Sequence, residues 1–299
     1  MVWSCLVSIL PGMAQTEKLT DYVNPFVGTD GYGNVYPGAQ IPFGGIQISP
    51  DTDSRFYDAA SGYKYNHLTL MGFSLTHLSG TGIPDLGDFL FIPGTGEMKL
   101  EPGTHEDPDQ GYRSRYSHDK EWASPNYYAV ELADYGVKAE MTSGVRSGMF
   151  RFTYPESDNA FIMIDMNHTL WQSCEWSNLR MINDSTITGY KLVKGWGPER
   201  HVYFTATFSK KLTGLRFVQD KKPVIYNTSR FRSSYEAWGK NLMACISFDT
   251  KAGEEVTVKT AISAVSTDGA RNNMKERLTD VLIDSVKADD GILLHLSTE

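Results

Sequence analysis

The polar residues that packing alone explains least lie between residues 61 and 88. Within this stretch His77 follows two hydroxyl residues and precedes a glycine-rich turn, and Asp85 and Asp88 come soon after it. Imidazole, hydroxyl and carboxylate groups bind the hydroxyls of a sugar, and glycines let backbone groups approach a ligand closely. The alternative is a buried turn in which His77 bonds to the backbone and the aspartates cap the bend at Gly87. The residue types are compatible with both a sugar site and a structural turn.

Further candidates are one aromatic and three acidic side chains. Trp196 lies between two glycines, which suits a ring that stacks on a sugar, although a core tryptophan is an equal alternative. Asp85 and Asp88 could instead bind a divalent ion together with nearby carbonyl oxygens. A third alternative combines them with Glu121 in a small hydrolase site. Nothing in the spacing of these acids requires them to meet.

Composition and charge exclude some classes of protein. The 299 residues are 40% hydrophobic, which is enough for a sizeable core in one large or two ordinary domains. The net charge of -8 argues against a nucleic-acid-binding surface, which needs clustered Lys and Arg. No apolar run is long enough to span a bilayer. We therefore expect no nucleic acid partner and no membrane span.

The first 14 residues resemble a secretory signal, because an apolar run at 3–10 is followed by small residues before Gln15. They lack the usual positive start, and a buried N-terminal strand is the alternative. We predict an exported protein, located in the periplasm, at the cell surface or in the medium. In an oxidising compartment Cys174 and Cys245 could form one disulfide.

The pattern from residue 20 to about 265 is one of short alternating or β-branched runs separated by Gly, Pro, Asn and Asp. It is typical of an all-β fold and predicts a large antiparallel β-sandwich rather than βαβ units. One predicted hairpin covers residues 184–190, with Gly189 marking a bulge. The clearest predicted strands are residues 127–132, 137–141, 148–154, 160–165, 185–192, 201–208, 242–248 and 255–263.

The pattern changes at residue 266, where a short helical connector is expected. Residues 268–278 predict a helix with Thr267 or Asp268 as its N-cap. The tail that ends at residue 299 departs from a helical pattern. Residues 266–299 therefore read as the start of a helical linker with a truncated or divergent end.

Ordered sequence blocks along nearly the whole chain resemble the N-terminal domain of glycoside hydrolase family 92. The blocks cover the polar stretch, the glycine-rich segments before it and several later strands. They are YVNPFVGT (22–29), YPGA (36–39), PFG (42–44), SPDT (49–52), SGY (61–63), GFS (72–74), THLSG (76–80), DLGD (85–88), HDKEWASPNYY (118–128), RSGMFRF (146–152), HVYF (201–204) and STDGA (266–270). The enzymes of this family are much longer than this chain.

The resemblance implies a calcium-dependent, inverting exo-α-mannosidase that removes terminal mannose, expected to be α-1,2-linked, from glycans. Inversion needs an acid and a base that lie roughly 6.5–9.5 Å apart to leave room for the attacking water. In the family both carboxylates, and most calcium contacts, belong to a C-terminal (α/α)6 barrel. The resemblance therefore implies that this chain holds neither catalytic carboxylate and contributes substrate-binding residues.

The resemblance also suggests which residues bind the sugar. By position, the stacking tryptophan of the family falls on Tyr57, whose smaller ring weakens any inference about linkage. Asn34 stands where histidine is common in the first glycine loop. Each of these residues has a structural alternative, such as a turn position or a surface aromatic. The predicted substrate-binding residues are Tyr57, Asp58, His77, Asp85, Asn34 and Trp196.

The competing hypothesis is a stand-alone, non-catalytic carbohydrate-binding or interaction module. Such a module would bury its barrel-facing surface in a partner or in a second copy. An exposed apolar patch on the isolated domain would instead favour a missing partner domain.

Overall fold

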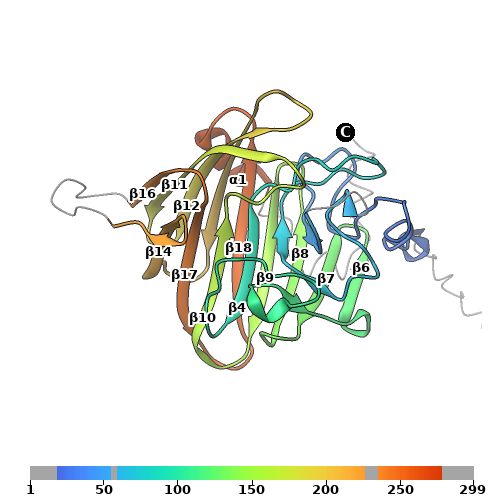
Figure 1. Cartoon of the computed structure of the whole chain (residues 1–299), viewed down its shortest axis with the longest axis horizontal. Coiled ribbons are helices and arrows are strands. Elements are labelled where there is room, and N and C mark those ends of the chain that lie inside the picture. The colour runs from blue at the N-terminus through green and yellow to red at the C-terminus, as the bar shows by residue number, and fades with distance from the viewer. Residues whose placement is uncertain (1–18, 55–58, 226–234, 278–299) are drawn as a thin grey trace, which may run out of the picture.

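The computed structural model describes residues 19–54, 59–225 and 235–277. Within them, two large antiparallel sheets form the body of the molecule, and a short helix, α1, lies near one end of the sheets (Figure 1). This arrangement confirms the predicted all-β sandwich with a helical connector. Tyr57 and Asp58, the predicted signal at 1–14 and the tail after residue 277 lie outside the described residues.

The first sheet has seven strands that come from distant parts of the chain. In spatial order they are β1 (Ser49–Asp51), β3 (Gly72–Ser74), β4 (Leu90–Thr95), β10 (Ser157–Asp165), β17 (Leu242–Thr250), β14 (Gly214–Gln219) and β15 (Lys222–Pro223).

The second sheet has nine strands and includes most of the predicted ones. In spatial order they are β16 (Glu236–Gly239), β11 (Ser173–Asn183), β12 (Thr186–Lys194), β13 (Arg200–Phe208), β18 (Glu254–Ser263), β9 (Ser147–Tyr154), β8 (Val137–Ser143), β7 (Tyr127–Leu132) and β6 (Glu121–Ser124). The remaining elements are the pair β2 (Thr69–Leu70) and β5 (Ser114–Arg115), the 3-10 turns Leu19–Tyr22, Pro108–Gln110 and His118–Lys120, and α1 (Thr267–Arg277).

Side-chain alternation along β10 shows how the core is built. Ile162 and Ile164 point into the space between the two sheets, where they join the main hydrophobic core. Phe161 and Met163 point to the opposite face and join a second cluster with Tyr112. Successive residues of a strand face opposite sides, so a continuous apolar run predicts a strand that is buried on both faces. The seven-stranded sheet is accordingly covered on both sides around β10.

Gly189 differs from its predicted role. It pairs in regular register with Leu179 and Phe204, and the irregularities of the β11–β12 hairpin fall elsewhere, between Cys174 and Trp176 and near the turn. A Cβ at Gly189 would lie 2.3 Å from Cε1 of Phe204. The glycine therefore makes room for a core phenylalanine rather than marking a bulge.

The helix α1 begins close to its predicted start, but its cap is a different residue. The Oγ of Ser266 accepts a hydrogen bond from the amide of Gly269 at 2.9 Å. Ser266 is therefore the N-cap, in place of Thr267 or Asp268. Cys174 and Cys245 are both buried as free thiols, so they do not form a disulfide. Over the residues that the structure describes, helices of the length and apolar character needed to cross a membrane are absent.

Candidate functional site

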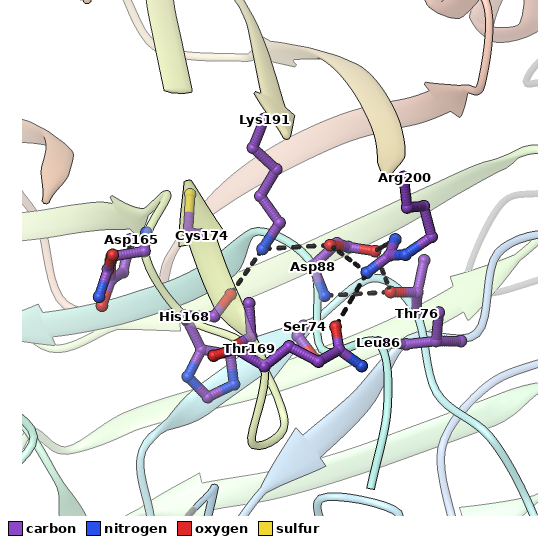
Figure 2. A network of polar contacts seen from close by, with 12 residues as sticks. Ser74, Thr76, Leu86, Asp88, Asp165, His168, Thr169, Cys174, Lys191 and Arg200 are labelled. Carbon is purple, nitrogen blue, oxygen red and sulfur yellow. Dashed lines mark hydrogen bonds and ion pairs between the residues drawn. The ribbon is translucent and has the colours of Figure 1, made fainter. Parts of the chain in front are cut away.

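A buried ion-pair cluster lies at the end of the sandwich where β4 begins and β12 ends (Figure 2). Its centre is the carboxylate of Asp88, which lies 3.1 Å from Nζ of Lys191 and accepts hydrogen bonds from both Nη atoms of Arg200. The hydroxyl of Thr76 also donates to it, at 2.7 Å. Asp88 and Lys191 have fully buried side chains, whereas Arg200 is 28% exposed. Asp88 thus ties two strands of the nine-stranded sheet to the loop before β4.

A second buried carboxylate, Asp51, lies between two histidines. Its two oxygens lie 2.8 Å from Nε2 of His77 and 2.9 Å from Nε2 of His168. The other ring nitrogen of His77, Nδ1, is 2.8 Å from the carbonyl oxygen of Gln47. Both nitrogens of His77 are therefore engaged, and its side chain is fully buried. The contacts match the structural alternative weighed for this histidine.

Backbone and amide groups join the two carboxylate clusters. Nζ of Lys191 donates to the carbonyl oxygen of His168 at 2.6 Å. Gln172 accepts from Nη2 of Arg200 at 3.3 Å and donates to the carboxylate of Asp85. The network therefore runs without interruption from β1 to the loop after β10 and on to the β12–β13 hairpin. It fixes the relative positions of the loops at this end of the sandwich.

Burial and charge act in opposite directions on these two carboxylates. Burial by itself raises the pKa of Asp88, but Lys191 and Arg200 outweigh it and hold that pKa well below its usual range. Burial likewise raises the pKa of Asp51, and the charge and hydrogen bonds of His77 and His168 hold it low. Both groups are therefore carboxylates that fold in their charged form.

The lowered pKa values predict a loss of stability in acid. A carboxylate whose pKa is lower in the folded than in the unfolded state stabilises the fold above its unfolded pKa of about 3.9. That contribution disappears as the pH falls through this value towards the folded pKa. We expect the free energy of unfolding in urea to stay level from about pH 7 to 5 and to fall steeply below about pH 4. In Asp51→Asn this acid-dependent fall should be shallower, and an equally steep fall would contradict the assignment.

The predicted binding residues divide into buried and exposed ones. His77 and Asp85 are buried, and the Asp85 carboxylate accepts from Gln172 and from the backbone amide of Leu86. Asn34 is half-buried on the glycine loop, and its carbonyl oxygen accepts from the amide of Gly80. Trp196 is 70% exposed in the β12–β13 connection. The structure thus brings the glycine loop beside the turn after His77 and leaves Trp196 open on the adjoining hairpin.

Sequence reasoning missed Lys191 and Arg200. The missed signal for Lys191 was its position, because it shares the inward face of β12 with Ile187 and Val193. A lysine at a core position of a strand indicates a buried anionic partner, since an unpaired charge there is very costly. No local pattern names that partner, which is 103 residues away in Asp88 by numbering. Arg200 gives no local signal either, because its partner Asp88 is 112 residues away.

The acids of the alternative hydrolase site have separate partners. Glu121 accepts hydrogen bonds from Tyr63 and Tyr128 and lies 2.6 Å from Nδ1 of His118. Asp88 is neutralised by two cations. In the described part of the chain, no group of three or more His, Cys, Asp or Glu side chains is arranged to hold a metal ion. Asp88 and Glu121 are therefore both engaged with other protein side chains.

Comparison with known proteins shows which family this chain resembles in sequence and in fold. The family model described as the glycosyl hydrolase family 92 N-terminal domain matches residues 22–263. The structure of a family GH92 alpha-mannosidase from Bacteroides thetaiotaomicron is 96% identical with a TM-score of 0.88, over 92% of this chain and 37% of that protein. An inverting family GH92 mannosidase from the same organism is 24% identical with a TM-score of 0.75, over 92% of this chain and 35% of that one, and supports the fold alone.

Another relative matches a smaller part of this chain. An uncharacterized secreted glycosidase of Arthroderma benhamiae is 30% identical over 139 residues, which are 46% of this chain and 17% of its own length. The chain therefore spans between about a sixth and two fifths of these relatives. Since the family model matches most of the chain, from residue 22 to 263, the protein belongs to glycosyl hydrolase family 92, and what it carries is the N-terminal domain of that family.

Proposed function

We propose that this chain is the N-terminal domain of an α-mannosidase that hydrolyses terminal mannose, expected to be α-1,2-linked, from glycans with inversion. The observation that carries the proposal is the match of residues 22–263 to the family's N-terminal domain, joined to 96% identity with an alpha-mannosidase of which the chain spans 37%. A following domain would supply the catalytic carboxylates. This chain would hold and orient the substrate.

The place where the chain leaves the sandwich supports this division. Strand β18 ends at Ser263, which pairs with Tyr203 near the start of β13, and α1 begins four residues later at Thr267. The β12–β13 hairpin with Trp196 lies at the same end (Figure 1). The connector α1 therefore begins at the end of the sandwich that carries the proposed sugar contacts.

Exposed aromatic side chains near these loops support a contact with a further domain. Phe43 is fully exposed and has a backbone φ of 60°, which is rare and costly for a bulky residue. The neighbouring Gly45 donates to the carbonyl oxygen of Val145, which fixes the Phe43 turn beside the β8–β9 hairpin. Tyr32 on the glycine loop is 92% exposed. Large apolar groups held in fixed, open positions suit a surface that a partner covers.

The proposed roles of the individual residues follow their exposure. We assign the exposed Trp196 and the half-buried Asn34 to direct sugar contacts. Tyr57 and Asp58 keep that role on the resemblance alone. Asp85 is buried and accepts from Gln172, so it would act by holding its loop in place. His77 would act through the loop that it anchors, because both its nitrogens already have partners. Calcium would bind mainly to the following domain, since Asp85 and Asp88 are engaged with protein groups. We also propose that the protein is exported, as expected for an enzyme that acts on glycans.

Mannose release tests this proposal. The purified chain alone should release no mannose from α-1,2-mannobiose, because the proposal places the acid and base that inversion requires in the following domain. Addition of the C-terminal part of the related Bacteroides mannosidase should restore release with calcium, and a chelator should abolish it. Turnover by the chain alone that a chelator stops would contradict the proposal. The C-terminal part alone is the control, because it measures any mannose release that does not require this domain.

A further inference from the structure

A groove of about 670 Å³ lies on the outer face of the nine-stranded sheet, between the edge strand β16 and the start of α1. Leu179 on β11 and Phe204 on β13 point into the main hydrophobic core. Successive residues of a strand face opposite sides of a sheet, so the neighbouring Asn178 and Tyr203 point outwards. Tyr190 on β12 pairs with both and completes the floor of the groove. Pockets for small ligands measure roughly 300–1,000 Å³, so the groove has the volume of such a site.

Three aromatic side chains form a row across this floor. Trp238 on β16 lies opposite Asn178, which in turn lies opposite Tyr190. Neighbouring strands lie roughly 4.8 Å apart, so the row from Trp238 to Tyr203 spans about 14 Å. The ring centres of Tyr190 and Tyr203 are 4.8 Å apart, and Trp238 is 54% exposed. Exposed aromatic groups that gather within a polar rim mark an interaction site or a ligand-binding groove.

Planar polar side chains lie between and beside these rings. The amide nitrogen of Asn178 donates to Glu236 at 3.3 Å and to a backbone carbonyl oxygen at 3.1 Å, which leaves the side-chain oxygen as an acceptor. Arg180 lies opposite Glu236, and within the described residues its guanidinium has no hydrogen-bond or ion-pair partner. On the α1 wall, Arg271 pairs with Asp268. Charges of both signs offset one another, so the groove offers hydrogen bonds without a strong net field.

The helix α1 forms one wall of the groove without covering its floor. Thr267 and Arg271, from the first half of the helix, line the groove. Further along, Met274 packs against an outer-face cluster that includes Tyr127 on β7 and Met149 on β9. These strands lie on the other side of β18 from β12 and β13. The helix therefore runs away from the groove towards the opposite edge of the sheet, and it leaves the aromatic row open.

This combination of groups fits a neutral, hydroxyl-rich ligand. The C–H face of a hexose stacks on an aromatic ring, and its hydroxyls both donate and accept hydrogen bonds. We propose that the groove binds a neutral oligosaccharide, with hexose rings stacked on Trp238 and Tyr190 and hydroxyls bound by Asn178, Arg180 and Glu236. This inference goes beyond the proposed function, because it adds a second sugar site. Only the choice of mannose as the probe rests on that function.

NMR titration of the 299-residue chain with α-1,2-linked mannotriose tests the groove. We expect the indole N–H signal of Trp238, assigned with Trp238→Phe, to shift in a saturable way. Trp238→Ala should raise the Kd read at the backbone amide of Tyr190 about tenfold, and Arg180→Gln should raise it severalfold. Both side chains are exposed, so neither substitution removes a core contact. Trp122→Ala is the matched control, since Trp122 is 45% exposed on the other edge strand, β6, and lies outside the groove.

A Trp238 signal that mannotriose does not shift, or a Kd that Trp238→Ala and Arg180→Gln leave unchanged, would overturn the groove proposal. An equal loss in Trp122→Ala would also overturn it. If the added C-terminal part of the Bacteroides mannosidase blocks mannotriose at Trp238, the groove is a contact between domains and the sugar site fails.

The mannose-release assay separates this proposal from the proposed function. If the added part restores release while the groove binds no mannotriose, the groove proposal fails and the α-mannosidase proposal stands. If mannotriose binds at Trp238 but the added part restores no release, the proposed function fails and the groove stands as a carbohydrate-binding site.

Discussion

Replacing Asp88 by asparagine should lower the free energy of unfolding by about 3–5 kcal/mol, a large part of the roughly 5–15 kcal/mol that stabilises a typical domain. The substitution leaves the ammonium group of Lys191 without its anionic partner in a fully buried position. The remaining contacts of that group are the carbonyl oxygen of His168 and the ring of Phe89. Neither neutralises the charge. Urea unfolding at pH 7 measures the loss.

Two further variants distinguish the loss of the ion pair from unspecific destabilisation by a substitution. Combining Asp88→Asn with Lys191→Met removes both buried charges, and this double variant should recover part of the lost stability. The exposed pair of Asp184 and Lys211 supplies the control, because its side chains are 64% and 76% exposed. Asp184→Asn should change stability by less than about 1 kcal/mol. A double variant no more stable than Asp88→Asn would contradict the assigned ion pair.

Replacing Gly62 by alanine should destabilise the domain by at least about 3 kcal/mol, from left-handed backbone strain and overpacking together. Gly62 has a φ of 88°, and a Cβ there would lie 2.1 Å from Oδ1 of Asp51. That oxygen is bonded to His77 and belongs to a fully buried side chain, so it cannot move without breaking the pair. Thermal and urea unfolding of the variant measure the loss.

Gly80→Ala provides the matched control for Gly62→Ala. Gly80 has a φ of 73°, but a Cβ there would meet no heavy atom within 4 Å. Only the backbone strain remains, at about 1–2 kcal/mol. Equal losses in the two variants would show that the contact with Asp51 carries no cost. A larger loss in Gly62→Ala would assign the excess to the carboxylate and the histidine behind it.

The strands were predictable because their pattern is local. The alternation along β9, β13 and β18 depends on neighbours in the sequence, and each prediction agrees with the structure within one residue at either end. Gly189 was wrongly predicted to mark a bulge, because a glycine can occur within a strand for several structural reasons. Here the ring of Phe204 on the adjacent strand leaves no room for a Cβ, and the sequence near Gly189 does not reveal that contact.

The candidate site was only partly predictable. The stretch around His77 was identified as structurally special, and it does lie at the loop end of the sandwich. The sequence did not identify the hydrogen-bond partners of His77, because a histidine beside hydroxyls and glycines suits a ligand and a buried hydrogen bond equally well. The structure places Asp51 and the Gln47 carbonyl oxygen against the two ring nitrogens, and a role of His77 in sugar binding stays a prediction.

The sequence by itself determined the all-β class, the approximate strands and the resemblance to family 92, because period-two patterning and ordered motifs are written in neighbouring residues. Only the tertiary structure decided which charges pair. Arg200 and Asp88 are 112 residues apart, and His168 and Asp51 are 117 residues apart. Such pairs depend on the order in which strands join the two sheets, and many orders satisfy the same local patterns. The folded chain selects the one that neutralises Lys191, Asp88 and Asp51 in its interior.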